Sequence, residues 1–317
     1  MKTIVVTNRL FDESFASCPE GFRLVMPKSG AGFDRASLLA NLSMADALIP
    51  MFDLPVDAGL IEAAERLQVI ANVGVGYNNI DLEAARRRGI AVCNTPYPVT
   101  EPTAELAMGL MIDVARGISL SDRRMRSQSE RWGVMENIGH GVYGKILGIV
   151  GFGRIGQSLA RRAAACGMRV VYYSRHRVDE AVERAFGAQW LTLDELLKTA
   201  DFISLNTPLT NETRHLIDAA KLALFKPTAY LINTARGAVV DETALVQALS
   251  EKRLAGAALD VFEFEPRVTA QLRQLDNTVI VPHIGTATRE ARNQMSADAL
   301  RNVVGFFAGD PAISRVL

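Results

Sequence analysis

Three ionisable side chains follow short apolar runs of strand length, and their types suit acid–base chemistry. Arg236, Glu265 and His283 each come within a few residues of the end of such a run. The runs span residues 229–233, 257–261 and 279–281. Parallel strands end at one edge of an open α/β sheet, so we expect the three side chains to gather there. Reduction of a ketone by hydride needs a proton donor for the developing alkoxide and a cation for a substrate carboxylate.

Each of the three side chains suits one of these tasks. His283 is the natural acid, because a histidine gains and loses its proton near neutral pH. Glu265 can orient the imidazole and favour its protonated form. The guanidinium of Arg236 has paired N–H donors whose geometry matches the carboxylate and carbonyl oxygens of a 2-oxo acid. Taken singly, each is also an ordinary loop residue, but three of them at neighbouring strand ends are better explained as a site.

A glycine-rich turn between a buried strand and a helix provides the nucleotide-binding signal. Residues 146–157 read ILGIVGFGRIGQ, and an apolar run leads there into Gly151, Gly153 and Gly156. We expect Gly151 to make a tight turn, Gly153 to let the backbone approach a pyrophosphate, and Gly156 to let the helix pack on the strand. The free N–H groups of the first helical turn would hold the phosphates. The alternative is an ordinary strand-to-helix turn.

The end of the next strand bears on the choice of cofactor. Residues 169–173 lead into Ser174, Arg175, His176 and Arg177, where an NAD-preferring site usually has Asp or Glu for the ribose hydroxyls. Ser174 can donate a hydrogen bond to a 2′-phosphate, and Arg175 can pair with its charge. We therefore predict that NADPH is preferred and NAD is possible. The alternative is that these side chains extend into solvent and bind the ribose loosely.

A second glycine-containing loop follows the run at residues 68–72. Gly74 and Gly76 stand on either side of Val75, which frees the backbone to approach a ligand. The N–H groups of this loop would hold a carboxylate. Alone, the loop would be interpreted as a turn with unusual dihedral angles.

Strands alternate with helices along the whole chain, which predicts βαβ units and mainly parallel sheets. Early strands are expected at residues 3–7, 23–26, 47–49, 68–72 and 90–93. A long helix at 290–307 would return the chain to the first domain. We expect two doubly wound domains: a flavodoxin-like, discontinuous substrate domain (1–98 and 288–317) and a Rossmann dinucleotide-binding domain (99–287).

Composition narrows the class of protein. The 317 residues carry 35 Lys plus Arg and 35 Asp plus Glu, so no net charge draws the chain to nucleic acid or anionic lipid. The three consecutive arginines at residues 86–88 are expected on a solvated helix face. Cys18, Cys93 and Cys166 are isolated, without metal-type spacing, and fit a reducing compartment. With no leader-like or membrane-spanning stretch either, we expect a cytoplasmic protein.

Several motifs resemble, in order, those of the D-isomer-specific 2-hydroxyacid dehydrogenase family, over essentially the whole chain. They are NVGVGYNNID, TAELAMGLM, GKILGIVGFGRIGQ, INTARGAVVDE, AALDVFEFEP and VPHIGTAT. The resemblance implies catalytic roles for Arg236, Glu265 and His283. It implies that Asp260 holds the nicotinamide carboxamide. The predicted substrate-binding residues are Val75, Gly76, Arg236 and His283. The predicted cofactor-binding residues are Gly151, Gly153, Arg154, Ile155, Gly156, Ser174, Arg175, Thr207, Pro208, Thr234, Asp260 and Gly285.

Within that family, the sequence YYSRHR looks like the glyoxylate and hydroxypyruvate reductases, which often use NADPH. The resemblance implies reduction of a small 2-oxo acid to the D-2-hydroxy acid. The missing acidic ribose residue counts against a D-lactate or phosphoglycerate dehydrogenase. A 2-ketogluconate reductase shares the motifs and remains an alternative, and a dinucleotide-sensing binding protein of the same fold is a second one.

Two segments bear on assembly. Residues 103–115 form a helix that is apolar nearly all round, so we expect it to be buried between domains or subunits. Residues 127–143 lack a clear period and carry Trp132, and we interpret them as an arm that forms part of an interface. The alternative is a plain surface loop. By analogy with the family, we expect a two-fold homodimer.

Overall fold

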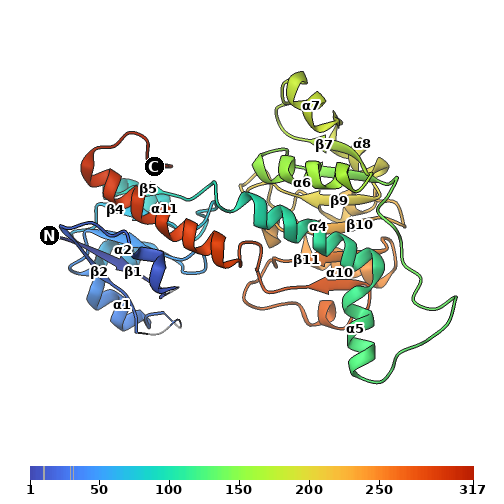
Figure 1. Ribbon diagram of the computed structural model, residues 1–317, viewed down its shortest axis with the longest axis horizontal. Coiled ribbons are helices and arrows are strands. Elements are labelled where there is room, and N and C mark those ends of the chain that lie inside the picture. Colours follow the sequence, from blue (N-terminus) through green and yellow to red (C-terminus); the bar gives the residue numbers. More distant parts are fainter. Residues whose placement is uncertain (10, 29, 31) are drawn as a thin grey trace. The chain divides into compact units, whose positions relative to one another are not determined.

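The computed structural model describes residues 1–9, 11–28, 30 and 32–317, and the chain divides into two compact units. Unit 1 comprises Met1–Val99 and Thr286–Leu317, and unit 2 comprises Thr100–Gly285. The sequence had placed these boundaries at 98/99 and 287/288. Figure 1 shows the elements of both units.

Unit 1 is built on a five-stranded sheet in which every pair of neighbouring strands is parallel. Its strands are β1 (Lys2–Val6), β2 (Phe22–Val25), β3 (Ala47–Ile49), β4 (Val69–Ala71) and β5 (Ala91–Cys93). Their order is β2-β1-β3-β4-β5, which is the flavodoxin-like order. The predicted doubly wound parallel sheet is confirmed, and its strand order reverses between β1 and β3.

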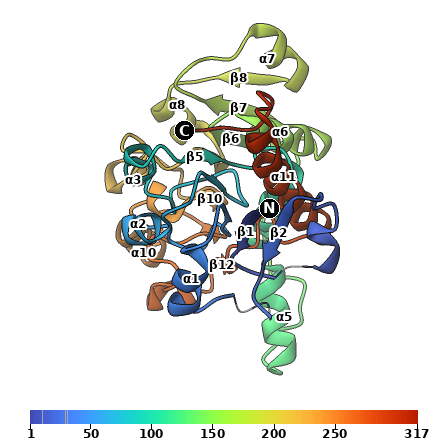
Figure 2. The same ribbon diagram turned by 90° about the vertical axis from the view of Figure 1, so that its left-hand side faces the viewer.

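Helices cover both faces of this sheet (Figure 2). One face carries α1 (Arg35–Leu42), α2 (Ala58–Ala63) and α3 (Leu82–Arg87), and the other carries α11 (Arg289–Ala308) with the short η1 (Asp12–Phe15) against it. Alternate strand residues such as Val5, Leu48 and Ile70 point into the core beneath α1, α2 and α3. Each of those three helices begins at an aspartate whose carboxylate accepts an N–H of the first turn.

The basic cluster at residues 86–88 lies on the solvated face that the sequence predicted. Arg86, Arg87 and Arg88 are all exposed. The guanidinium of Arg88 also donates hydrogen bonds to carbonyl oxygens at the end of α2 and just after it. The acceptors belong to Ile61, Glu62, Ala64 and Glu65. This arginine therefore caps carbonyl groups at the carboxyl end of a neighbouring helix.

Unit 2 is built on a seven-stranded sheet, again with all neighbouring strands parallel. Its strands are β6 (Ile146–Val150), β7 (Arg169–Tyr173), β8 (Ala188–Trp190), β9 (Phe202–Leu205), β10 (Tyr230–Asn233), β11 (Gly256–Leu259) and β12 (Thr278–Ile280). The order β12-β11-β10-β9-β6-β7-β8 is the Rossmann order with one added strand. It reverses between β6 and β9, so ligands are expected at the carboxyl ends of those strands.

Two helical layers enclose this sheet. One layer contains α4 (Thr100–Arg116) and α6 (Arg154–Ala165); the other contains α8 (Leu193–Thr199), α9 (Ala219–Leu222) and α10 (Glu242–Ser250). Unit 2 also contains α7 (Glu180–Phe186), η2 (Gly237–Val239) and η3 (Ala270–Arg273). The helix expected at 103–115 is longer and has a polar stripe, since Glu101 and Glu105 pair with Arg161 and Arg162 of α6. None of the described helices combines the length and apolarity needed to cross a membrane.

The arm expected at residues 127–143 follows a helix that the sequence analysis missed. This helix, α5 (Ile118–Arg126), buries no side chain and leads into the long exposed segment visible in Figure 1. A sequence search for apolar periodicity has little to find in a helix whose residues all remain at least partly in water.

Candidate active site

His283 and Glu265 form a hydrogen-bonded pair beyond the carboxyl ends of β12 and β11. The distance from His283 Nδ1 to Glu265 Oε2 is 2.9 Å. The amide of Phe262 donates to the other carboxylate oxygen of Glu265 at 2.9 Å, which fixes the orientation of that group. Burial alone would raise the pKa of Glu265, but the hydrogen bond and charge of His283, the amide of Phe262 and the charge of Arg236 outweigh it and hold the pKa below its usual value. The carboxylate is therefore ionised beside the imidazole.

The backbone at His283 adopts a left-handed conformation, with φ of 54°, which is uncommon for a residue with a Cβ. Asp260 holds it there from both sides. The carbonyl oxygen of Asp260 accepts the N–H of His283 at 2.8 Å, and its carboxylate accepts the amides of Ile284 (2.6 Å) and Gly285 (2.8 Å). Burial raises the pKa of Asp260 to about 6, against the opposing effect of these amides and of His283. Asp260 thus places the histidine, and its role toward the nicotinamide carboxamide stays a prediction.

Arg236 follows β10 and lies close to the same loop. Its neighbour Gly237 packs so tightly that an added Cβ would stand 1.8 Å from the carbonyl carbon of Phe262. The carbonyl oxygen of Arg236 accepts the side-chain amide of Asn233 at 3.0 Å, which ties the turn back to β10. Burial lowers the pKa of Arg236, and the negative charge of Glu265 opposes that shift. Unit 2 therefore brings together all three ionisable residues that the sequence singled out.

The glycine turn after β6 has the geometry expected of each glycine. Gly151 has φ of 96°, which favours glycine. A Cβ on Gly156 would lie 2.3 Å from the carbonyl oxygen of Gly151, so only glycine allows α6 to pack this closely on the turn. A Cβ on Gly153 would meet no atom within 4 Å, which leaves room for a ligand to approach. Arg154 and Ile155 open α6, whose N-cap supplies no side-chain hydrogen bond to their amides.

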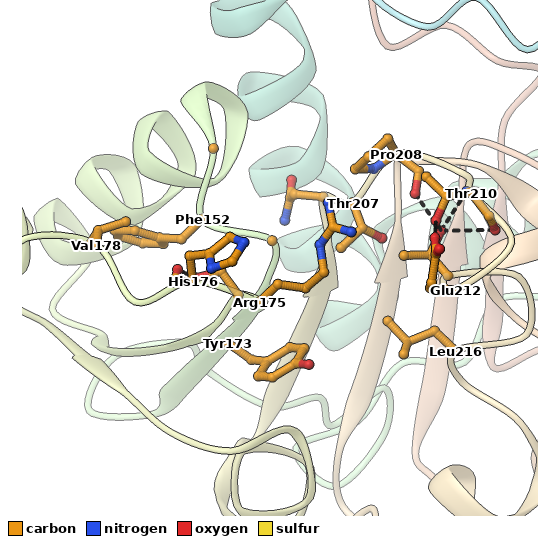
Figure 3. A pocket seen from close by; sticks show the side chains of 15 residues that line it. Phe152, Tyr173, Arg175, His176, Val178, Thr207, Pro208, Thr210, Glu212 and Leu216 are labelled. Carbon is orange, nitrogen blue, oxygen red and sulfur yellow. Dashed lines mark hydrogen bonds between the residues drawn. The ribbon is translucent and has the colours of Figure 1, made fainter.

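A cavity of about 400 Å³ adjoins this turn. Figure 3 shows it, with the side chain of Arg175 extending into it. Six of the predicted cofactor-binding residues line it: Gly151, Gly153, Ser174, Arg175, Thr207 and Pro208. Its far wall, from Thr210 to Leu216, was not predicted, because this irregular segment has no periodic pattern. The hydroxyl of Thr210 donates to the Glu212 carboxylate at 2.6 Å in that wall.

The three polar side chains after β7 differ in their availability. The hydroxyl of Ser174 donates to the carbonyl oxygen of His176 at 2.5 Å, so its proton is already used. Arg177 forms a two-pronged ion pair with Glu183, with both distances 2.8 Å, and lowers the pKa of that carboxyl to about 2. Arg175 lines the cavity and is exposed. Of the two arginines near the expected ribose position, Arg175 faces the cavity.

Unsatisfied polar atoms mark the ends of β9 and β10. Among the described residues, the buried atoms Asn206 Oδ1, Thr207 Oγ1 and Thr234 Oγ1 have no hydrogen-bond partner. Buried polar atoms normally have one, so these three are suited to a polar ligand. Together with the open Gly153 and the amides that begin α6, they fit a dinucleotide whose phosphates lie on the helix terminus. Thr207 and Thr234 were predicted; Asn206 was recognisable only as part of a strand end.

The loop with Val75 and Gly76 follows β4 in unit 1. Its carbonyl groups are tied to side chains, with Asn94 donating to Val75 O at 2.8 Å and Asn72 donating to Gly76 O at 2.7 Å. Neither asparagine could be recognised from the sequence, because each contact joins the loop to a side chain whose position depends on the fold.

A Rossmann sheet with this glycine turn, and an Arg–Glu–His cluster at three strand ends, define a nucleotide-dependent oxidoreductase. Residues 108–285 match the family described as D-isomer specific 2-hydroxyacid dehydrogenase, NAD binding domain. The chain belongs to the D-isomer-specific 2-hydroxyacid dehydrogenase family, and its cofactor is a nicotinamide dinucleotide.

Relatives and solved structures agree with this membership. The chain is 44% identical to a glyoxylate reductase of Thermococcus litoralis over 97% of its own length and 94% of the relative. It is 43% identical to a glyoxylate reductase of Pyrococcus furiosus over 97% and 93%. An NADPH-dependent glyoxylate/hydroxypyruvate reductase of Sinorhizobium meliloti, solved with NADP and malonate, is 31% identical with a TM-score of 0.85, covering 99% of this chain and 96% of that one.

Proposed function

We propose that the protein is a cytoplasmic reductase that prefers NADPH and converts a small 2-oxo acid, such as glyoxylate or hydroxypyruvate, to the 2-hydroxy acid, with the D configuration where the product is chiral. The observation that carries the proposal is the 2.9 Å pair of His283 and an ionised Glu265, within the electrostatic reach of Arg236. The similarity to glyoxylate reductases supports the substrate class.

Each residue has a separate task in this proposal. His283 donates a proton to the carbonyl oxygen of the substrate as charge develops on it. Glu265 orients the imidazole and stabilises its protonated form. Arg236 binds the substrate and its developing negative charge. A bound reduced nicotinamide supplies the hydride that adds to C2.

The preference for NADPH rests on the residues after β7. The position that carries an acidic residue in NAD-preferring sites is Ser174 here, so no carboxylate repels a 2′-phosphate at that position. Arg175 lines the cavity and provides the positive charge. Glu212, on the opposite wall, carries a negative charge that opposes a phosphate, so the preference is expected to be moderate.

One assay tests the proposal. The purified protein is given glyoxylate, hydroxypyruvate and 2-ketogluconate in turn, each with NADPH and with NADH, and oxidation of the cofactor is followed by absorbance. We expect the highest kcat/KM with a two- or three-carbon acid and NADPH, and D-glycerate as the product from hydroxypyruvate. A maximum with 2-ketogluconate would favour the sugar-acid reductase, and binding of NADPH without turnover would favour a dinucleotide sensor.

We further propose a homodimer formed through unit 2. Large apolar side chains are exposed on α5 and on the following segment, including Trp132 (80% exposed), Val134 (97%) and Met135 (79%). An exposed apolar patch of this kind typically marks an interaction site. Light scattering at micromolar concentration is expected to give twice the mass of the chain, and a monomer would contradict this.

A further inference from the structure

We propose that Asn94 and Ser314 are positioning residues for the carboxylate of the substrate. They pin the carbonyl oxygen of Val75 and so aim the amide of Gly76 at the ligand. This inference rests on the proposed function only in taking the substrate to be an acid.

The orientation of the loop amides follows from the geometry of the peptide bond. In a trans peptide, the C=O of one residue and the N–H of the next point in opposite directions. Val75 O accepts a hydrogen bond from Asn94 Nδ2 at 2.8 Å, and Gly74 O accepts one from the amide of Thr95 at 3.0 Å. Because Asn94 and Thr95 are adjacent residues after β5, the amides of Gly76 and Val75 both point away from that side of the loop. In the described part of the chain neither amide donates a hydrogen bond, so both can bind one anion.

The side chain of Asn94 is itself held in one orientation. Its Oδ1 accepts the hydroxyl of Ser314 at 2.7 Å, which leaves the NH₂ group to face Val75. The backbone of Asn94 is also held, since its N–H donates to Ser314 O at 3.0 Å and its carbonyl oxygen accepts Asn302 Nδ2 at 2.9 Å. The amide of Ser314 completes the cluster by donating to Asn302 Oδ1 at 3.0 Å.

The segment that carries Ser314 is fixed against the sheet edge. Val316 donates to Val92 O at 2.8 Å, Val92 donates to Leu317 O at 3.1 Å, and Arg315 bridges Cys93 in antiparallel fashion. The serine therefore stands on a segment that is hydrogen-bonded to the edge of the sheet beside β5.

This polar cluster is buried, and the burial of amide groups lowers the stability of the fold, so the cluster calls for an explanation other than packing. Asn94 is 7% exposed and Asn302 is 6% exposed. Buried amides lower stability unless every hydrogen bond is made, and apolar side chains would fill the same space without that risk. An apolar side chain could not hold a carbonyl oxygen, however. The polar cluster thus fixes the direction of the peptide group between Val75 and Gly76, which apolar packing could not do.

The test compares an acid with its neutral ester on Asn94→Ala, Ser314→Ala and the wild type. We expect Asn94→Ala to lower kcat/KM for glyoxylate about 10-fold, chiefly by raising KM, and to leave kcat/KM for methyl glyoxylate and the Kd of NADPH nearly unchanged. Ser314→Ala removes one hydrogen bond and leaves Asn94 in place, so we expect about a 3-fold effect in the same direction. Calorimetry of oxamate on the NADPH complex is expected to show a matching rise in Kd.

Asn41→Ala is the matched control. Asn41 also donates from its side chain to a backbone carbonyl, that of Ser37 at 2.7 Å, but on α1. If the asparagine variants lower the acid and ester reactions equally, or leave the oxamate Kd unchanged, the inference is wrong. Should Asn94→Ala fail to fold, Ser314→Ala decides the matter alone. Absence of wild-type turnover with every 2-oxo acid would contradict the proposed function instead, and oxamate binding would still test the amides.

Discussion

The two sheets carry polar groups of different kinds at the ends of their strands. After β4 in unit 1, the loop at Val75 and Gly76 offers neutral backbone amides that neutral asparagines hold in place. After β10, β11 and β12 in unit 2, the groups are an arginine, a glutamate and a histidine, all ionisable.

This difference separates binding from chemistry. Amides keep the same charge at every pH, so the unit 1 loop would hold a carboxylate equally well across the assay range. The unit 2 cluster depends on where its protons lie, because only a protonated histidine can donate one. Variants of His283 and Glu265 should therefore change kcat and its pH dependence, and variants around the amide loop should change KM. A variant of Arg236, which binds the substrate as well as its developing charge, should change both.

The largest expected effect comes from His283→Ala. Removal of a positioned acid typically lowers kcat by about 10²–10⁴-fold. The Kd of NADPH, measured by fluorescence titration, should hardly change, because the imidazole acts on the substrate oxygen. If His283→Ala kept the wild-type kcat, His283 would not be the proton donor, and the proposed difference between the two sheets would be wrong.

An intermediate effect is expected from Arg175→Ala. NADPH binding should weaken about 10-fold, the lower end for a charge-assisted hydrogen bond, because this side chain is exposed. NADH binding should barely change. Arg177→Ala is the control, since that guanidinium is paired with Glu183 and its loss should lower the melting temperature without altering the NADPH/NADH ratio. Equal losses of both cofactors in Arg175→Ala would show that the arginine does not recognise the 2′-phosphate.

The smallest and most diagnostic change is expected from Glu265→Gln. Because the pKa of Glu265 lies below its usual value, the residue is a carboxylate at neutral pH and favours the imidazolium. Without that charge, the imidazole loses its proton at lower pH, so the basic limb of the kcat profile for reduction should move to lower pH. Asn94→Ala changes no charge and should leave the limb where it is. A uniform fall in rate without movement of the limb would mean that Glu265 does not tune His283.

Local patterns were enough to predict every strand except β8, the glycine turn and the clustering of Arg236, Glu265 and His283. Apolar runs and fixed glycine spacing are local properties, and parallel strands deliver their ends to one edge. The capping contact of Arg88 was missed because it depends on tertiary structure, and nothing near Arg88 in the sequence indicates that it caps another helix. The hydrogen bond from the Ser174 hydroxyl to the carbonyl oxygen of His176 is local, but it requires one particular turn conformation, which the residue types alone do not specify.

The hydrogen bond between Asn94 and Ser314 also has a consequence for biosynthesis. The two residues stand 220 positions apart in the sequence, and all of unit 2 is translated between them. A ribosome therefore releases the strands of unit 1 long before the helix and edge segment that complete it. Unit 2 is continuous and can fold in the meantime, since domains generally fold as units. The hydrogen bonds that hold the loop at Val75 and Gly76 are complete only when Ser314 has left the exit tunnel, so unit 2 can fold before the loop that we propose binds the substrate carboxylate.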